Sequence, residues 1–167
     1  MGEINIDDII DKARNWKRGN RFEDFEIGRQ FSHHWGRTIT ESDNVNFSVL
    51  TLTYNPVYTN REVAMARGFT GSPVNPYLVF NTVFGLSVED LSEGGGPFVG
   101  VNNLRFLSDV YPGETVYATS EVIAARLTKG RPGYGIVTWK TQGKRSNGEV
   151  VVEFERSNLV RQRESEA

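Results

Sequence analysis

The segment NPYLVFNTVFGLSVEDL, from Asn75 to Leu91, restricts the fold more than any other part of this 167-residue chain. Asn75 is a favoured helix N-cap and Pro76 suits the first helical position, so a helix is predicted from Tyr77 to Leu91. Its residues are apolar nearly all round until Glu89. Because a helix without a polar face must be covered on every side, we expect it to lie buried at the centre of the fold.

The sequence after this helix is typical of β-structure. A Gly-rich connection, EGGGP, leads to four predicted strands: VGVNNLRF, ETVYATSEVIAARLT, IVTWKTQGKR and EVVVEFERSNLVR. The last two are joined by Ser146-Asn147-Gly148-Glu149, a type I′ hairpin signal. One buried helix followed by long antiparallel strands predicts an α+β hot-dog domain, in which the sheet wraps around the helix. Such a sheet leaves an edge and a face uncovered, so we expect the domain to dimerise.

The chain ahead of the central helix is predicted to hold one strand region and two short helices. Alternating apolar residues indicate a strand from about Phe25 to Thr40. Thr40 followed by Asp43 resembles a capping box, so a helix is expected to begin near Glu41. A second short helix is expected from about Arg61 to Arg67. The inward face of the strand is predicted to carry Phe31, His33, Trp35 and Ile39.

Length and composition narrow the class of protein. We place one domain at residues 21–163, between an amphipathic extension at residues 1–20 and a tail at residues 164–167. There is no cysteine, which excludes disulfide and thiolate chemistry. The net charge of −2 argues against nucleic acid or an acidic membrane as the main partner. No apolar run reaches the roughly 18 residues of a membrane span. The opening is too acidic for a secretory signal, so a cytoplasmic location is expected.

Several motifs in register resemble the MaoC-like hydratase/dehydratase family. They are GRTITESDNVNF, the Asn55-Pro56 turn, PVNP before the central helix, and RF…VYPGETV from Arg105. GLSVEDLS and RPGYGIVTW are similar to its mesaconyl-CoA and methylmalyl-CoA dehydratase branch. The resemblance implies hydration of an enoyl thioester, or dehydration of a 3-hydroxyacyl thioester. Acyl groups of the mesaconyl or itaconyl type are among the candidate substrates. It implies no cofactor beyond the coenzyme A of the substrate.

The family's catalytic loop usually reads Asp-x-Asn-Pro-x-His, and this chain departs from it. The Asp position falls on Thr53 and the His position on Tyr58, within TYNPVYTN. Threonine cannot act as a base near neutral pH, whereas a phenol with a pKa of about 10 can donate a proton. The family also uses a backbone N–H at the start of the buried helix, but Pro76 has no N–H to offer. The resemblance therefore makes Tyr58 the candidate proton donor.

The remaining candidates each have a structural and a functional interpretation. His33 is either a hydrogen-bonded core histidine or an acid or base near Tyr58. Tyr54 is either a packing residue or part of the site, and Asn55 is expected to brace its turn. The candidate catalytic set is thus Thr53, Tyr54, Asn55, Tyr58 and His33.

Substrate contacts are expected at the start of the helix and in a basic stretch. Asn75 is a cap or a substrate contact, and Tyr77 follows it in the first turn. Lys129 and Arg131 lie in a segment with six basic residues and no acid, Arg126–Ser146, which either holds the phosphates of coenzyme A or forms a solvated hairpin. No cluster of His, Asp and Glu has the spacing of a metal site.

Two hypotheses of function remain. The first is a hydro-lyase acting on an acyl-CoA thioester, with Tyr58 as its acid. The second is a non-catalytic partner subunit that completes the acyl-binding tunnel of a heterodimeric hydratase, because the usual Asp and His are replaced. Thioester hydrolysis ranks last, since Glu89 lies at the wrong end of the helix.

Overall fold

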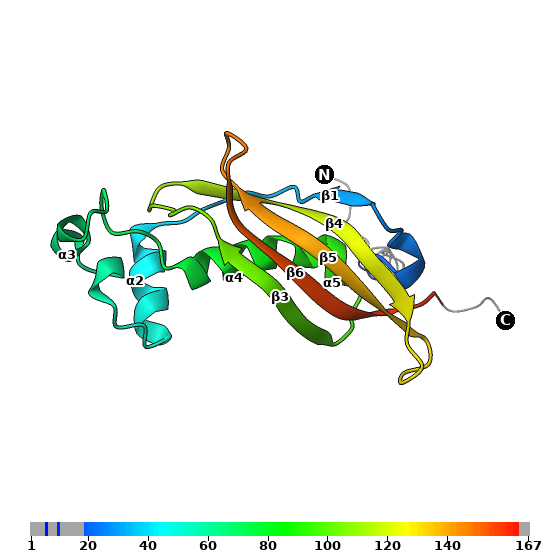
Figure 1. Cartoon of the computed structure of the whole chain (residues 1–167). Coiled ribbons are helices and arrows are strands. Elements are labelled where there is room, and N and C mark those ends of the chain that lie inside the picture. The colour runs from blue at the N-terminus through cyan, green and yellow to red at the C-terminus, as the bar shows by residue number, and fades with distance from the viewer. Residues whose placement is uncertain (1–5, 7–9, 11–18, 164–167) are drawn as a thin grey trace.

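A computed structural model of the chain describes residues 6 and 10 and residues 19–163. These residues form a curved antiparallel sheet with a helix lying along one face (Figure 1). The strand order is β1-β4-β5-β6-β3, and β2 pairs with β4. This confirms the predicted α+β hot-dog architecture and its four long strands. The strands are β1 (Gln30–Ser32), β2 (Arg37–Thr38), β3 (Phe98–Phe106), β4 (Thr115–Leu127), β5 (Tyr134–Lys144) and β6 (Val150–Arg161).

The central helix is interrupted where a single helix was predicted. Helix α4 (Pro76–Leu86) ends at Ser87, whose hydroxyl donates a hydrogen bond to the Phe84 carbonyl 2.7 Å away. A short helix, α5 (Val88–Ser92), follows. A side-chain hydroxyl that binds the backbone of the preceding turn competes with helix continuation, which explains the break.

Helix α4 approaches the sheet closely. A Cβ atom added at Gly143 in β5 would lie 2.5 Å from Val83 Cγ2 and 2.7 Å from Val152 Cγ1, so only glycine fits there. Buried apolar side chains of the helix and the sheet form the main core between them. This core holds Ile39, Val74, Leu78, Val79, Val83, Val110, Val116, Ala118, Val151, Val152 and Phe154.

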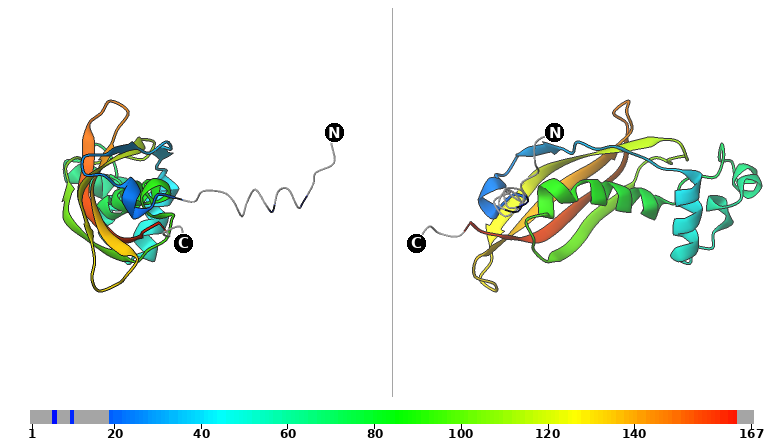
Figure 2. Two further views of the ribbon diagram at one scale, coloured as in Figure 1. Left: turned by 90° about the vertical axis from the view of Figure 1, so that its right-hand side faces the viewer. Right: turned by 180° about the vertical axis from the view of Figure 1, so that it is seen from behind.

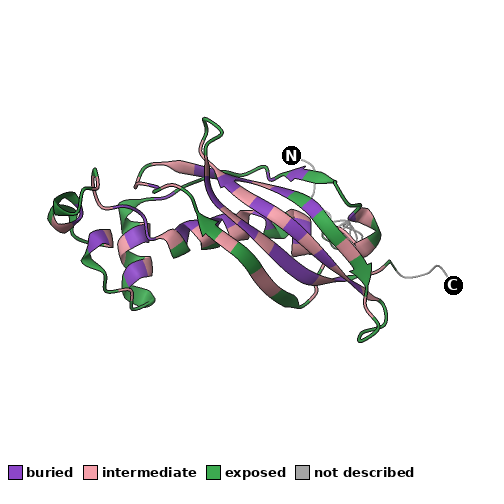
Figure 3. Ribbon diagram, viewed as in Figure 1, coloured by how far each residue is buried: buried purple, intermediate pink, exposed green. Residues whose placement is uncertain are grey.

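The single chain leaves one stripe of α4 uncovered, although the sequence predicted burial on every side. Tyr77, with 56% of its surface exposed, is followed at helical spacing by exposed Asn81 and Gly85. The reason is geometric, because the sheet covers only one side of the helix (Figure 2). Figure 3 colours the chain by burial, and along β5 buried and half-buried positions alternate.

Three short helices lie beyond one end of the sheet, next to the first turn of α4 (Figures 1 and 2). They are α2 (Glu41–Leu50), the 3₁₀ turn η2 (Pro56–Tyr58) and α3 (Arg61–Ala66). The predicted capping box is confirmed, since the Thr40 hydroxyl accepts the Asp43 N–H and the Asp43 carboxylate accepts the Thr40 N–H.

The predicted strand from Phe25 to Thr40 is mostly irregular. A 3₁₀ turn, η1 (Phe22–Asp24), precedes it, and only β1 and β2 are extended. Phe31 and Ile39 are buried as expected, but Trp35 is 67% exposed, because the chain between the two short strands breaks the alternation.

The β5–β6 hairpin also differs in detail from its prediction. Gly148 has a φ of 87°, whereas Asn147 is not among the residues with positive φ. A type I′ turn needs positive φ at both central residues. The Arg145 N–H instead donates to the Glu149 carbonyl at 2.9 Å, and the Gly148 N–H donates to the Arg145 carbonyl at 3.0 Å. A three-residue loop with glycine in the left-handed position therefore closes the hairpin.

The predicted extension at residues 1–20 and the tail at residues 164–167 lie mostly outside the described residues. Within the part of the chain that the structure describes, no helix combines the length and hydrophobicity needed to cross a membrane.

A buried arginine stabilises the far end of the helix–sheet packing. Arg156 is 1% exposed, and its guanidinium donates hydrogen bonds to Ser87 Oγ at 3.0 Å and Asn158 Oδ1 at 2.9 Å, and also to Ser92 Oγ. It stacks over the Phe84 ring, with Arg156 Cζ 4.2 Å from the ring centroid. Burial lowers the pKa of Arg156 to about 10. The fork of a guanidinium can satisfy several acceptors at once, which a lysine ammonium cannot.

Replacing Arg156 with lysine should lower the free energy of unfolding by about 1–3 kcal/mol, since buried acceptors lose their donors while a charge stays buried. Arg105, which is exposed and pairs with Glu153, provides the matched control. The change Arg105→Lys should cost less than about 0.5 kcal/mol. Urea unfolding of both variants measures this difference, and equal costs would contradict the role given to Arg156.

Candidate active site at the start of α4

A buried asparagine pair joins the short helices to the first turn of α4. Asn44 of α2 accepts the Asn75 N–H at 2.7 Å and donates to the carbonyls of Tyr58 at 2.9 Å and Pro73 at 3.0 Å. Asn75 Nδ2 lies 3.3 Å from Ser48 Oγ. Asn44 is 1% exposed and Asn75 is fully buried. These bonds fix the loop that carries Tyr58 against the amino-terminal end of α4.

The first turn of α4 has its backbone donors occupied. Pro76 has no N–H, and the Tyr77 N–H donates to Asn75 Oδ1 at 3.0 Å. The N–H groups of Leu78 and Val79 both donate to the Asn75 carbonyl. Asn75 therefore acts as the helix cap, as one of its two interpretations predicted. A thioester oxygen finds no free backbone donor in this turn, unlike the arrangement that the family resemblance implied.

The TYNPVYTN loop keeps its turn geometry. Asn55 caps η2 by accepting the Val57 N–H at 3.3 Å, so it braces the turn as predicted, and it also accepts Arg67 Nη1 at 3.2 Å. The Thr53 hydroxyl lies 3.0 Å from the Thr51 hydroxyl. Tyr54 is 78% exposed. Thr53 and Tyr58 are the half-buried members of the predicted set in this loop, and the Tyr58 carbonyl is joined through Asn44 to the start of α4.

Tyr58 is half-buried and has a perturbed hydroxyl. Burial raises the pKa of Tyr58 above its ordinary value of 10.0, and the charge of Asp109 and the neighbouring Tyr77 raise it further. The phenol therefore stays protonated at neutral pH, and it can donate a proton or a hydrogen bond but cannot serve as a resting base. The Tyr77 ring packs edge-on against Phe106, with centroids 5.7 Å apart.

A cavity of about 190 Å³ opens at this end of α4. The helix side of its wall is mostly apolar, and the other side comes from the segment between β3 and β4. Asp109 provides the carboxylate in the wall, and Ser108 provides a hydroxyl. The lining residues are Val74, Pro76, Val79, Phe106, Leu107, Ser108, Asp109, Val110 and Val151.

Sequence reasoning passed over Asp109, because its position before Pro112-Gly113 is explained by turn formation alone. It also missed Asn44 and Ser48, although both are polar residues on the face of α2 that turns inward. One signal was available, since α2 lacks an apolar face and its buried residues are polar. Nothing in the local sequence indicates that Asp109 lines a cavity at the start of α4.

Arg145 fixes the segment that carries Asp109. Its guanidinium donates to Glu114 Oε1 at 2.8 Å, to Ser108 Oγ at 3.0 Å and to the Asp109 carbonyl. Burial opposes ionisation of Glu114, but hydrogen bonds from Arg145 and the Tyr111 N–H outweigh it and lower the pKa of Glu114. The charge-assisted pair thus holds the backbone of the Asp109 segment in place.

His33 lies at the other end of the central helix and does not meet Tyr58. Its Nδ1 is 2.6 Å from Asp90 Oδ2 in α5, and its Nε2 is 2.9 Å from Ser120 Oγ in β4. The 11 residues of α4, roughly 16 Å of helix, separate these groups from Asn75. The order Asp90–His33–Ser120 has the bonding pattern of a nucleophilic triad. Ser120 is buried, however, and its hydroxyl also bonds Thr141 at 2.8 Å. His33 is therefore a hydrogen-bonded core histidine.

Lys129 and Arg131 are also remote from Tyr58. Both are exposed in the turn between β4 and β5, at the end of the sheet opposite α2 and α3 (Figure 1). Arg131 stacks on the Tyr134 ring, with Cζ 4.5 Å from the centroid. Contact with coenzyme A phosphates stays a prediction for these two residues.

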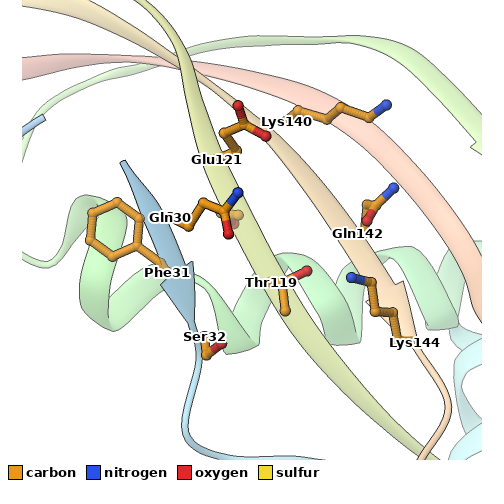
Figure 4. Close-up of a pocket in the computed structure, with 9 residues that line it drawn as sticks. Gln30, Phe31, Ser32, Thr119, Glu121, Lys140, Gln142 and Lys144 are labelled. Carbon is orange, nitrogen blue, oxygen red and sulfur yellow. The ribbon is translucent and has the colours of Figure 1, made fainter. Parts of the chain in front are cut away.

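A second, larger cavity of about 230 Å³ lies on the outer face of the sheet, over β1, β4 and β5 (Figure 4). Its wall carries Glu121, Lys140 and Lys144 among polar side chains, and Lys140 pairs with Glu153 at 3.3 Å. The sheet separates it from α4 and its first turn. We therefore place the candidate site at the smaller cavity, which Asp109 lines. Tyr58 does not line it, but its carbonyl is joined through Asn44 to the start of α4.

Comparison with known proteins gives the family. The sequence profile described as "Mesaconyl-CoA hydratase" matches residues 3–167. The chain is 36% identical to the mesaconyl-CoA hydratase of Haloarcula hispanica over 163 residues, covering 97% of this chain and 46% of that protein. It is 36% identical to the beta-methylmalyl-CoA dehydratase of Chloroflexus aurantiacus over 150 residues, covering 89% of this chain and 42% of that protein. The chain thus spans slightly less than half the length of both relatives.

Solved structures agree with this assignment. A MaoC-domain dehydratase from Chloroflexus aurantiacus superposes with a TM-score of 0.83 at 36% identity, covering 89% of this chain and 42% of that one. A Mycobacterium tuberculosis protein described as a double hot-dog fold gives a TM-score of 0.76 at 20% identity, covering 89% of this chain and 46% of that one, and shows the fold alone. The chain belongs to the mesaconyl-CoA hydratase family of MaoC-like hot-dog proteins.

Proposed function

We propose that this chain is a hydratase/dehydratase unit that adds water to, or removes water from, a short acyl-CoA thioester of the mesaconyl or itaconyl type. The observation that carries the proposal is the cavity at the start of α4, with Tyr58 nearby, in a chain of this family. The relatives' names supply the reaction class. The cavity and its neighbouring groups supply a place for the chemistry.

The size of the cavity favours a short acyl group. Pockets for drug-sized ligands typically measure about 300–1,000 Å³, and this cavity is smaller, at about 190 Å³. An acyl group of a few carbons fits such a volume, whereas the pantetheine arm and nucleotide must lie outside it. The apolar wall from Val74 and Val79 suits the hydrocarbon part of the acyl group.

Tyr58 acts as the proton donor in this proposal. Burial and the charge of Asp109 keep its phenol protonated at neutral pH, because both raise its pKa. In hydration, Tyr58 gives its proton to the α-carbon as water adds to the β-carbon. A positioned acid or base contributes about 10²–10⁴ to the rate, so the loss of this single group is measurable.

The unit is expected to work as one of a pair. β3 is an edge strand of the sheet, and Phe98 and Val99 on it are each 55% exposed. The exposed stripe of α4 that begins at Tyr77 adds a second uncovered surface. Edges and apolar faces of this kind are covered by pairing with another unit. The relatives' greater length leaves room for a second unit of similar size within their chains.

A second candidate function is a non-catalytic partner unit. The observation that favours it is the first turn of α4, where the backbone donors are occupied by Asn75 and Pro76 offers none. Thr53 and Tyr58 also replace the carboxylate and imidazole of the family's usual loop. In this case the chain completes the acyl-binding surface of a second hot-dog unit that carries Asp and His.

Purified protein given crotonyl-, mesaconyl- and itaconyl-CoA should change the absorbance of the enoyl band. The change Tyr58→Phe should lower kcat by about 10²–10⁴-fold, because it removes the proton donor while keeping the ring. Tyr117→Phe is the matched control, since Tyr117 is 41% exposed on the outer side of β4. Equal kcat values for wild type and Tyr58→Phe would rule out the proton-donor role.

The partner hypothesis is tested by assembly. Under our main proposal, the purified chain turns over a thioester by itself, and its mass in solution is that of a dimer. If folded chain turns over none of the three thioesters alone, but an Asp- and His-bearing hot-dog protein that co-purifies with it restores turnover, the partner function replaces the enzyme function.

A further inference from the structure

We propose that Asp109 is the general base of this hydratase and activates water in the cavity at the start of α4, together with Tyr58 as the acid. The inference rests on the proposed function and deepens it. It names a carboxylate from a different segment as the replacement for the one absent at Thr53.

Asp109 is positioned for this role by the cavity. It lines the cavity together with Val74, Pro76 and Val79, which lie at the start of α4. Its charge acts on Tyr58 strongly enough to contribute to the raised pKa of the phenol, and such an interaction weakens with distance. Asp109 thus combines a place in the cavity wall with the negative charge that a base requires.

The Asp109 carboxylate is available to water and substrate. Its side chain is exposed, and within the described residues it makes no hydrogen bond or ion pair. Its backbone, in contrast, is held because Arg145 donates to its carbonyl and to the neighbouring Ser108 hydroxyl. A free carboxylate on a fixed backbone is the arrangement that a positioned base needs.

Glu114 and Asp43, in contrast, are committed to structural contacts. Glu114 is paired with Arg145 and also accepts the Tyr111 N–H at 2.6 Å. Asp43 accepts the Thr40 N–H and pairs with Arg37 at 3.0 Å. Neither is in the wall of the cavity. Asp109 is the carboxylate that lines it.

The proposed step balances without any added reactant. Asp109 takes a proton from water as the water oxygen bonds to the β-carbon of the enoyl group. The π electrons of the C=C bond move to the α-carbon, which takes the Tyr58 proton and becomes a CH₂ or CHR centre. The proton on Asp109 then returns to the Tyr58 phenolate through water. The net reaction converts an enoyl thioester and water into a 3-hydroxyacyl thioester.

The test compares Asp109→Asn with Glu26→Gln in the full chain, in the assembly that shows activity. Glu26 is an exposed carboxylate between η1 and β1 that does not line the cavity, and it serves as the matched control. We expect Asp109→Asn to lower kcat by at least about 100-fold with KM changed less than about threefold. Glu26→Gln should behave as wild type. The double variant Asp109→Asn/Tyr58→Phe should be little worse than the slower single variant, because the two groups act in one step.

Chemical rescue separates a base from a structural contact. Added formate should restore part of the kcat of Asp109→Ala and none of that of Tyr58→Phe. If wild type is active and Asp109→Asn keeps a third or more of its kcat, or if formate restores nothing to Asp109→Ala, this inference is overturned and the proposed function stands. If wild type is inactive on every thioester in every assembly, the proposed function is overturned and the inference with it.

Discussion

The contact between α4 and the curved sheet is the constraint on which the rest of the structure depends. Gly143 lets the helix come close enough for Val83 to reach β5, and the main core forms between them. This packing fixes where the helix begins. The Asn44–Asn75 hydrogen bond then joins that beginning to α2 and to the loop of Tyr58. The apolar packing sets the position of the site, and the buried amides set the geometry around it.

The same amides that stabilise the first turn of α4 also change its chemistry. A helix N-terminus can stabilise negative charge through its free N–H groups. Here the Tyr77 N–H donates to the Asn75 side chain, and Pro76 has no N–H. The turn therefore offers no free backbone donor to a thioester oxygen. In our proposal, the reactive groups of this chain therefore come from side chains around the helix start. Tyr58 provides a protonated phenol and Asp109 a free carboxylate.

Much of the fold could be predicted from the sequence, because its signals are local. The caps at Thr40 and Asn75 depend on neighbours in the chain. Trp35 is exposed, although burial was predicted, because alternation holds only while the strand continues. The site was less predictable. The turn role of Asn55 is local, but the place of Asp109 in the cavity wall arises only when the segment after β3 folds back beside the start of α4. The role of His33, catalytic or structural, could not be assigned from its strand face alone. That face extends from the candidate site to the far end of the core, where His33 bonds Asp90.

The most direct test of the central claim is a crystal structure of the chain with a bound, non-reacting acyl-CoA analogue. Our account predicts that the acyl group lies in the cavity at the start of α4. Its α-carbon should be near the Tyr58 hydroxyl, and its β-carbon one water molecule away from the Asp109 carboxylate. An acyl group bound instead in the outer-face cavity of Lys140 and Lys144, or away from both Tyr58 and Asp109, would contradict it.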